Sequence, residues 1–387
     1  MSNASHLDFY IQNGISPVHY VIGNQSEHFE RRASLYRSLG LLPRAVQGSR
    51  VLEVAVGSGQ NSLYLASLRP QSLTLVEPNP TGIREIRKLY AETTVPNTAP
   101  TLVESTLQDY QPADKFDIVI CENWLGRLPH ERALLRKLAG MIDRNGMMVV
   151  TTQPPVGLLS NFLRRALSAK YSDPRLSFSE RTQILVTMFA PHLSTMKAMT
   201  RSATDWVQDN MINPAYFDLY LTIPDVFLEV GDRMTAVGTN PSFVTDWRWF
   251  KALHGDARDF NNQMIHQYQA AQHNLVDYQI EFAQPDLESN RRLEIASVVF
   301  LESVRSYEHA LIAGKGGDSA LAASQTALHG VLGCMKDFPA QIRSGIEAGL
   351  RLLESRGDYV QVSTDSPFSR LFGRENIYLS MIADKAA

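Results

Sequence analysis

Short apolar runs that alternate with helical segments between Gly48 and Thr152 constrain the fold of this chain more than any other feature of its sequence. Helical segments follow the first, second and fourth of these runs, which lie at residues 50–56, 73–77, 102–103, 116–121 and 147–152. Strands separated by helices at this spacing form right-handed crossovers, in which the strands are parallel and helices cover both faces of the sheet. We therefore predict an α/β fold with a mostly parallel sheet.

Helical periodicity dominates the rest of the chain, together with two further candidate strands. Residues 377–382 alternate and are rich in β-prone types, and we expect them to return to the sheet as its last strand. The helical stretches before them are then large insertions. The predicted organisation, in order, is an N-terminal helical cap (1–47), a sheet core (48–155), a helical insertion (156–230), a returning strand (231–245), a helical domain (246–370) and a C-terminal strand that completes the sheet (371–387).

A glycine-containing loop joins the first predicted strand to the helix that follows it. Gly57 and Gly59 allow a tight turn and the close approach of a ligand to the backbone, and the helix N-terminus offers unpaired N–H groups. Glu77 ends the second strand, where a carboxylate accepts hydrogen bonds from both ribose hydroxyls. This arrangement predicts a nucleoside-containing cofactor at the carboxyl ends of parallel strands.

Two cofactor classes fit such a loop, and two residues distinguish them. A dinucleotide site has the pattern Gly-x-Gly-x-x-Gly, but Ser62 stands at the position of the third glycine. Glu53, inside the first strand, would repel a pyrophosphate, whereas it would attract the sulfonium and ammonium groups of S-adenosylmethionine. The sequence therefore favours the sulfonium cofactor.

Residues 50–152 resemble the core of a class I S-adenosylmethionine-dependent methyltransferase. Glu53, Gly57 and Gly59 match the first motif of that family, with Ala55 in place of its first glycine. The resemblance implies a Rossmann-like sheet with an antiparallel last strand. It also implies that the loop holds the methionyl end of the cofactor and that Glu77 binds the ribose.

The resemblance places further residues around the cofactor and the methyl-transfer site. Thr106 and Leu107 match the pair that usually contacts the adenine. Asn123, which follows the fourth strand, is also expected to bind the cofactor. The candidate general bases for a hydroxyl acceptor are Glu122, His130 and His19. No Asn-Pro-Pro-Tyr follows the fourth strand, so methylators of DNA base amino groups are a poor model.

The charge balance argues against a protein whose main task is to bind nucleic acid. The chain has 37 Lys and Arg against 40 Asp and Glu, a formal net charge of −3, and therefore lacks a strong basic field. The N-terminal residues lack the basic start and apolar core of a signal peptide, and no apolar run reaches the roughly 18 residues of a membrane helix. We expect a cytoplasmic protein without membrane contact, with a small-molecule substrate and a homodimeric state. No metal site is predicted.

The leading hypothesis is direct in-line methyl transfer to a small biosynthetic molecule, with the helical portion setting specificity. One alternative uses the same cofactor for aminocarboxypropyl transfer or for a cyclisation that releases methylthioadenosine. Another is a non-catalytic binding protein with the same fold. Two smaller expectations concern packing: Arg164 and Arg165 lie on a solvated helix face, and Trp247 and Trp249 pack in the core.

Overall fold

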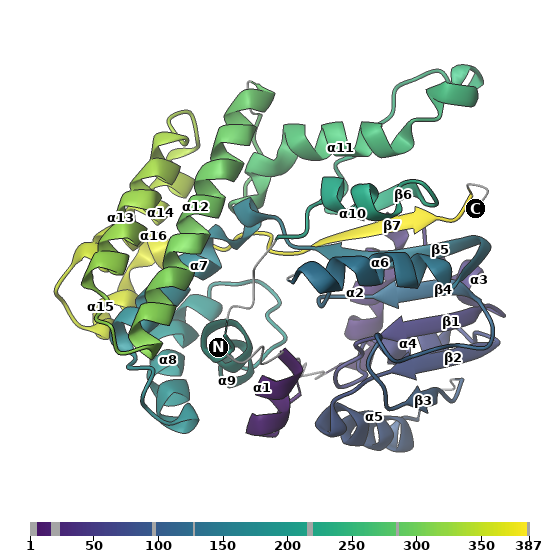
Figure 1. Cartoon of the computed structure of the whole chain (residues 1–387), viewed down its shortest axis with the longest axis horizontal. Coiled ribbons are helices and arrows are strands. Elements are labelled where there is room, and N and C mark those ends of the chain that lie inside the picture. Colours follow the sequence, from purple (N-terminus) through teal and green to yellow (C-terminus); the bar gives the residue numbers. More distant parts are fainter. Residues whose placement is uncertain are drawn as a thin grey trace. The chain divides into compact units, whose positions relative to one another are not determined.

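The computed structural model contains a seven-stranded sheet with the order β3-β2-β1-β4-β5-β7-β6 (Figure 1). The structure describes residues 6–16, 24–94, 98–126, 128–214, 220–283 and 286–384. Strands β1 to β5 are parallel, whereas β7 is antiparallel to both of its neighbours, β5 and β6. The strands are β1 (Arg50–Val54), β2 (Ser72–Val76), β3 (Thr101–Val103), β4 (Phe116–Cys121), β5 (Ile142–Thr152), β6 (Thr235–Asn240) and β7 (Ile377–Ile382). The predicted α/β fold with an antiparallel last strand is confirmed.

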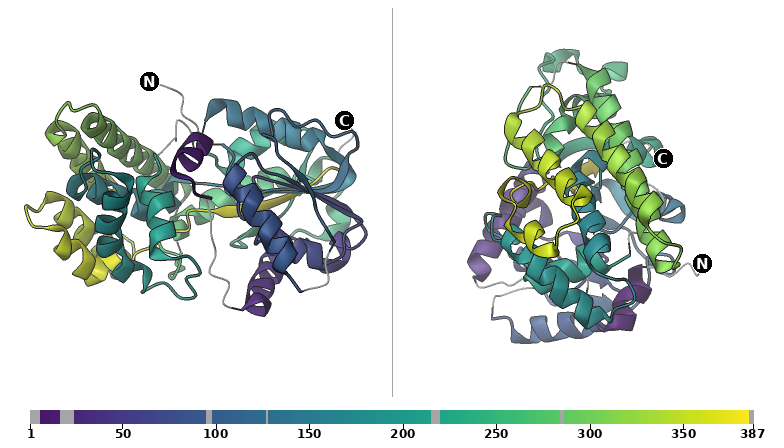
Figure 2. Two further views of the ribbon diagram at one scale, coloured as in Figure 1. Left: turned by 90° about the horizontal axis from the view of Figure 1, so that it is seen from below. Right: turned by 90° about the vertical axis from the view of Figure 1, so that its left-hand side faces the viewer.

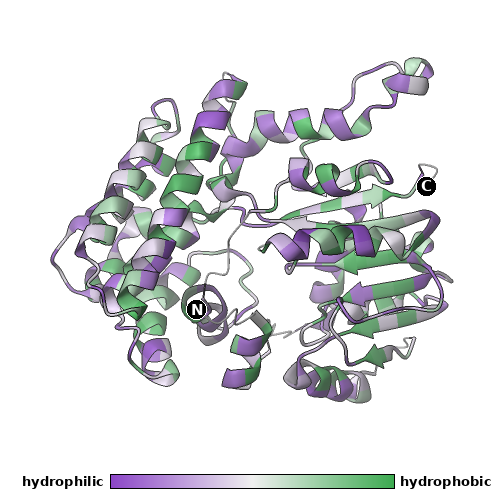
Figure 3. Cartoon of the chain, in the orientation of Figure 1, coloured by the Kyte–Doolittle hydropathy of each residue, from purple (hydrophilic) through white to green (hydrophobic). Residues whose placement is uncertain are grey.

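The sheet belongs to the first of two compact units, which comprises residues 1–153, 216–268 and 376–387. Buried side chains of α2, α4 and α5 form one core cluster with the strands, and α6 lies on the opposite face from α2 (Figure 2). Apolar residues are concentrated along the strands, as both faces of the sheet are covered (Figure 3). The helices are α1 (His6–Asn13), α2 (Gln25–Ser38), α3 (Pro43–Val46), α4 (Ser62–Ser67), α5 (Pro80–Glu92), α6 (Pro129–Gly140) and α10 (Ile223–Val230), followed by the short turns η2 (Phe250–Ala252) and η3 (Gly255–Ala257).

The strand register brings the ends of three central strands to one level. Val54 of β1 pairs with Val76 of β2 on one side and with Cys121 of β4 on the other. The residues that follow these strands, including Glu77 and Glu122, therefore lie at the same edge of the sheet. This is the edge at which ligands bind in open α/β sheets.

The second unit, residues 154–215 and 269–375, is helical. Helix α11 (Phe260–Ala271) spans the boundary between the units in sequence. The helices of the second unit are α7 (Pro155–Tyr171), α8 (Phe178–Leu193), α9 (Ala203–Val207), η1 (Gln208–Ile212), η4 (Gln272–Leu275), α12 (Leu287–Ile312), α13 (Asp318–Gly333), α14 (Ala340–Glu354), α15 (Tyr359–Thr364) and α16 (Ser366–Ser369). The domain boundaries expected from the sequence remain predictions. In the described ranges, none of the helices has the length and apolarity needed to cross a bilayer.

The expected solvent exposure of Arg164 and Arg165 is wrong, because α7 is buried along nearly its whole length. Arg164 is 0% exposed, and its guanidinium donates to Leu371 O at 2.9 Å and stacks 3.8 Å from the ring centre of Phe372. Carbonyl oxygens and aromatic faces replace the water that this charge loses on folding.

The expected core packing of Trp247 and Trp249 is also wrong. Trp247 is 92% exposed and Trp249 is 64% exposed, in the irregular segment after β6. Alternating aromatic residues predict burial only within a strand that has a covered face, and β6 ends at Asn240.

Candidate functional site

The loop after β1 turns sharply because three of its residues have left-handed backbone conformations. The φ angles of Ala55, Gly57 and Gly59 are 59°, 63° and 80°. A Cβ atom on Gly59 would lie 2.8 Å from Cγ1 of Ile86, so only glycine fits there without movement of the Ile86 side chain on α5. Ala55 adopts the same conformation with a side chain, which costs roughly 1–2 kcal/mol.

Glu77 ties this loop to the end of β2. Its buried carboxylate accepts hydrogen bonds from the backbone N–H groups of Gly57 and Asn79, both at 2.8 Å. Burial raises the pKa of Glu77 to about 7, although these N–H groups favour the charged form. Val56 makes a further backbone hydrogen bond to this carboxylate. A carboxylate has about four acceptor sites, so the side chain can still accept another hydrogen bond.

Gly82, in the first turn of α5, allows the helix to approach both the loop and Glu77. A Cβ atom at this position would lie 2.7 Å from the carbonyl oxygen of Gly57 and 3.2 Å from Cγ of Glu77. The sequence analysis missed this residue. A glycine in the first turn of a helix that follows Glu77 was the available signal.

Two buried carboxylates lie at this edge of the sheet. Glu53 is the second-last residue of β1, and Glu122 directly follows β4. Glu122 Oε1 accepts a hydrogen bond from Arg32 Nη2 at 2.6 Å, in an ion pair that is almost completely buried. Burial, and then the negative charge of Glu122, raise the pKa of Glu53 to about 8, and the positive charge of Arg32 offsets this only in part. The pair therefore has one compensating cation for two acids.

Helix α2 supplies the groups that hold these carboxylates, and the sequence analysis did not assign them to the site. His28, Arg32 and Tyr36 recur at four-residue spacing and are all buried on the same helix face. Arg32 also donates to the Tyr36 hydroxyl, and Nε2 of His28 lies 3.1 Å from the carbonyl oxygen of Gln60. The signal was the spacing of three polar side chains along an otherwise amphipathic helix.

Three buried oxygen atoms at this edge of the sheet have no hydrogen-bond partner in the described part of the chain. They are Oε2 of Glu53, Oε2 of Glu122 and Oδ1 of Asn123. Asn123 has a left-handed φ of 60°, and its backbone N–H donates to the Thr151 hydroxyl on β5. All three atoms are acceptors, two of them on acids, so they fit a cationic ligand and disfavour a pyrophosphate.

The remaining predicted residues lie in different surroundings. Thr106 and Leu107 follow β3, where the Thr106 hydroxyl donates to Asp109 Oδ2 at 2.7 Å and Leu107 is buried. His130 is exposed in the first turn of α6. His19 lies outside the described residues. The roles assigned to these four residues remain predictions.

A family model described as a methyltransferase domain matches residues 51–146, about a quarter of the chain. The match begins in β1 and ends in β5, and it therefore includes the loop, Glu77 and Glu122.

Curated relatives match the same part of the chain. Proteins named ribosomal RNA small subunit methyltransferase G are 30% identical over 96 residues in Aliivibrio fischeri and 31% identical over 110 residues in Haemophilus influenzae. The matches cover 22% and 26% of this chain, and 45% and 53% of the relatives. The chain thus spans about half the length of the curated relatives it matches.

Solved structures with some similarity include two methyltransferases. Magnesium protoporphyrin IX methyltransferase from Synechocystis, with bound S-adenosylmethionine, has 18% identity and a TM-score of 0.33 over 40% of this chain and 79% of that one. The N-methyltransferase NodS from Bradyrhizobium japonicum, in complex with S-adenosylhomocysteine, has 15% identity and a TM-score of 0.31 over 39% of this chain and 74% of that one.

Proposed function

We propose that this chain, which belongs to the class I S-adenosylmethionine-dependent methyltransferases through its domain at residues 51–146, transfers a methyl group to a small-molecule acceptor by direct in-line displacement. The family and its cofactor, both predicted from the sequence, are confirmed by the domain match. The observation that carries the proposal is the set of three buried, unpartnered acceptor atoms on Glu53, Glu122 and Asn123. Their chemistry suits a ligand with a positive sulfur and an ammonium group.

The residues proposed to hold the cofactor lie on one edge of the sheet. Glu53 and Asn123 would face its cationic end, and the loop with Gly57 and Gly59 would approach its methionyl part. Glu77 would accept the ribose hydroxyls, while Thr106 and Leu107, after β3, would contact the adenine.

Bound S-adenosylmethionine supplies a methyl group on a positively charged sulfur, which an acceptor atom attacks in line. The chain's contribution is alignment and exclusion of water from the reacting atoms. Glu122 is the candidate base that lies with the cofactor residues. Arg32 occupies one of its oxygens and leaves Oε2 unpartnered. His130 and His19 remain alternative candidates for removal of the acceptor proton.

A small acceptor is proposed on the basis of charge and chain organisation. The net charge of −3 gives no general attraction to a polyanion. The helical unit, residues 154–215 and 269–375, lies beyond the matched domain and supplies the additional surface proposed to select the acceptor. The curated relatives are named for ribosomal RNA, so RNA is the competing acceptor that the experiment must include.

The test is to incubate the full chain with methyl-labelled S-adenosylmethionine and either a metabolite extract or total RNA. Label in a small molecule, together with S-adenosylhomocysteine as the by-product, is the expected result. Label in RNA would refute the acceptor class, and methylthioadenosine as the by-product would refute methyl transfer. The E77A variant controls for cofactor-dependent labelling and should lose most of it.

Location and assembly are further parts of the proposal. A cytoplasmic location is proposed because Cys121 and Cys334 are free cysteines, which suits a reducing compartment, and cell fractionation tests it. A homodimer is proposed as the assembly state, and light scattering of the purified chain tests that.

A further inference from the structure

The helical unit contains a cavity of about 120 Å³ that is mostly apolar. It lies among the C-terminal end of α7, the start of α8, the turn η1 and the last turn of α12. Its polar lining is Arg165, Ser168, Ser172, Arg181, Glu308 and His309. Its apolar wall includes Ala169, Pro174, Met211, Ile212, Leu311 and Ile312.

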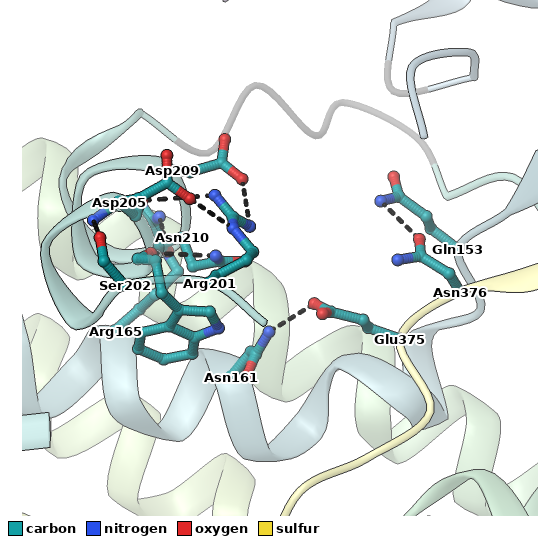
Figure 4. Close-up of polar contacts among 11 residues, drawn as sticks. Gln153, Asn161, Arg165, Arg201, Ser202, Asp205, Asp209, Asn210, Glu375 and Asn376 are labelled. Atoms are coloured by element: carbon teal, nitrogen blue, oxygen red, sulfur yellow. Dashed lines mark hydrogen bonds and ion pairs between the residues drawn. The ribbon is translucent and has the colours of Figure 1, made fainter. Parts of the chain in front are cut away.

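Two of the polar residues are buried and keep a donor atom without a partner. Arg165 is 6% exposed, and its Nη1 donates to the carbonyl oxygen of Asn210 at 2.8 Å (Figure 4). The same Nη1 donates to the carbonyl oxygen of Asn213 at 2.9 Å, and Nη2 pairs with Glu308 at 2.8 Å. Its Nε has no hydrogen-bond partner among the described residues. Ser172 is 1% exposed, and its hydroxyl is equally without a partner there.

Arg181 brings a second positive charge to the same cavity. Its Nε is buried without a hydrogen-bond partner, and it forms no ion pair with any residue in the described ranges. Burial, and then the positive charge of Arg165, lower the pKa of Arg181, and the carboxylates of Glu308 and Asp173 offset this only in part. Two guanidinium groups thus share one paired carboxylate, since Asp173 is bound by Arg175.

The turn η1 is a π-helix. This element is rare in proteins, and where it occurs it is often at a functional site. The N–H of Asn213 donates to Gln208 O at 2.9 Å, one residue further than in an α-helix. The widened turn brings the carbonyl oxygens of Asn210 and Asn213 to Arg165 and places Met211 and Ile212 on the cavity wall.

We propose that this cavity binds a small organic anion, a short-chain carboxylate whose charged end contacts Arg181 and Ser172 and whose aliphatic end contacts Met211 and the last turn of α12. Unpartnered donors select an acceptor with negative charge, and the apolar wall selects an aliphatic body. An apolar cavity of about 150 Å³ accommodates benzene, so a chain of roughly four or five carbon atoms suits this one. The site lies outside the matched methyltransferase domain and does not depend on methyl transfer.

The test is a titration of the full chain with butyrate, butyramide and inorganic phosphate, with methyl-¹³C-methionine labelling as the readout. Butyrate should shift the Met211 resonance saturably, assigned with an M211L variant, and should leave that of Met264, in the sheet unit, unchanged. Replacing a charged hydrogen-bond donor weakens binding by about 10- to 100-fold, and this is the loss expected for R181M. S172A should weaken binding by less and is a smaller change to the fold. R351Q is the matched control, because Arg351 is an exposed arginine of α14 in the same unit and does not line the cavity.

Several results would overturn the proposal. Butyramide binding as tightly as butyrate would show that charge is not recognised, and phosphate binding as tightly would show that the aliphatic end is not. Equal losses in R181M and R351Q, or no shift of Met211 with butyrate, would show that the cavity is not the site.

Discussion

Binding of S-adenosylmethionine should release a proton, because Glu53 must become ionised to face a cation. The pKa of Glu53 in the free protein is about 8, raised by burial and by Glu122. At pH 7, one unit below this value, ionising the group costs about 1.4 kcal/mol. Binding that requires the ionised form should therefore release roughly 0.9 proton at pH 7 and strengthen roughly tenfold between pH 7 and pH 9.

Calorimetry in two buffers of different ionisation enthalpy counts the protons released. The amino group of the cofactor titrates in the same pH range, so the informative quantity is the difference between the wild type and E53Q. The variant keeps the shape of the side chain and cannot ionise, and it should lose both the release from Glu53 and the associated pH dependence. E92Q, which replaces an exposed glutamate of α5, is the control and should behave like the wild type.

The same shift makes a second, independent prediction for the free protein. The folded state holds a proton on Glu53 that the unfolded state, with a pKa near 4.5, releases. The free energy of unfolding should therefore fall as the pH rises from 4.5 to 8, by at most about 5 kcal/mol, and E53Q should flatten this fall. The placement of Glu53 beside the cofactor would be refuted if the wild type and E53Q released equal numbers of protons on cofactor binding and showed the same pH dependence of cofactor affinity.

Three further predictions concern residues that support the two units. R32M leaves the buried Glu122 without its cation and should destabilise the sheet unit by about 3–5 kcal/mol, whereas R32M/E122Q should recover part of this loss; additive losses in urea unfolding would contradict the ion pair. At Ala55, glycine should be neutral or slightly stabilising and valine should destabilise by about 1–2 kcal/mol, since φ is 59° there, and equal thermal melting of the two variants would argue against the left-handed conformation. Burial and then the charge of Arg164 lower the pKa of His192 to about 3, so the helical unit should lose stability as the pH falls from 6.5 toward 3, by up to about 1.4 kcal/mol per pH unit. H192Q should remove this slope in unfolding curves, and an unchanged slope would assign it to other groups.

The local sequence pattern predicted the sheet and the cofactor loop, because residues close together in the sequence determine the structure of both. The strand that ends in Glu77 and the glycines that follow Glu53 lie within short stretches of chain whose backbone geometry is nearly fixed by residue type. The partner of Glu122 was not predictable in the same way. Arg32 lies 90 residues away in sequence, and only the packing of α2 against the sheet brings the two together.

Burial of charged and aromatic side chains was the least predictable feature. Helix α7 has no exposed polar face, because other helices of its unit surround it. Arg164 and Arg165 are therefore buried with the rest of the helix. The free energy of a buried guanidinium depends on carbonyl oxygens contributed by distant segments, such as Leu371. The prediction for Trp247 was wrong in the opposite sense: burial was expected, but the side chain is exposed because it does not lie in a strand with a covered face.

The position of β7 between β5 and β6 governs when the sheet unit can assemble during synthesis. Among the described strands, β6 pairs only with β7, and residues 377–382 are synthesised after every residue of the helical unit. The nascent chain must therefore keep β6 and one edge of β5 unpaired while the helical unit is being made. A released chain that ends before residue 377 should contain every residue of the helical unit and an unfinished sheet, a state that limited proteolysis can detect.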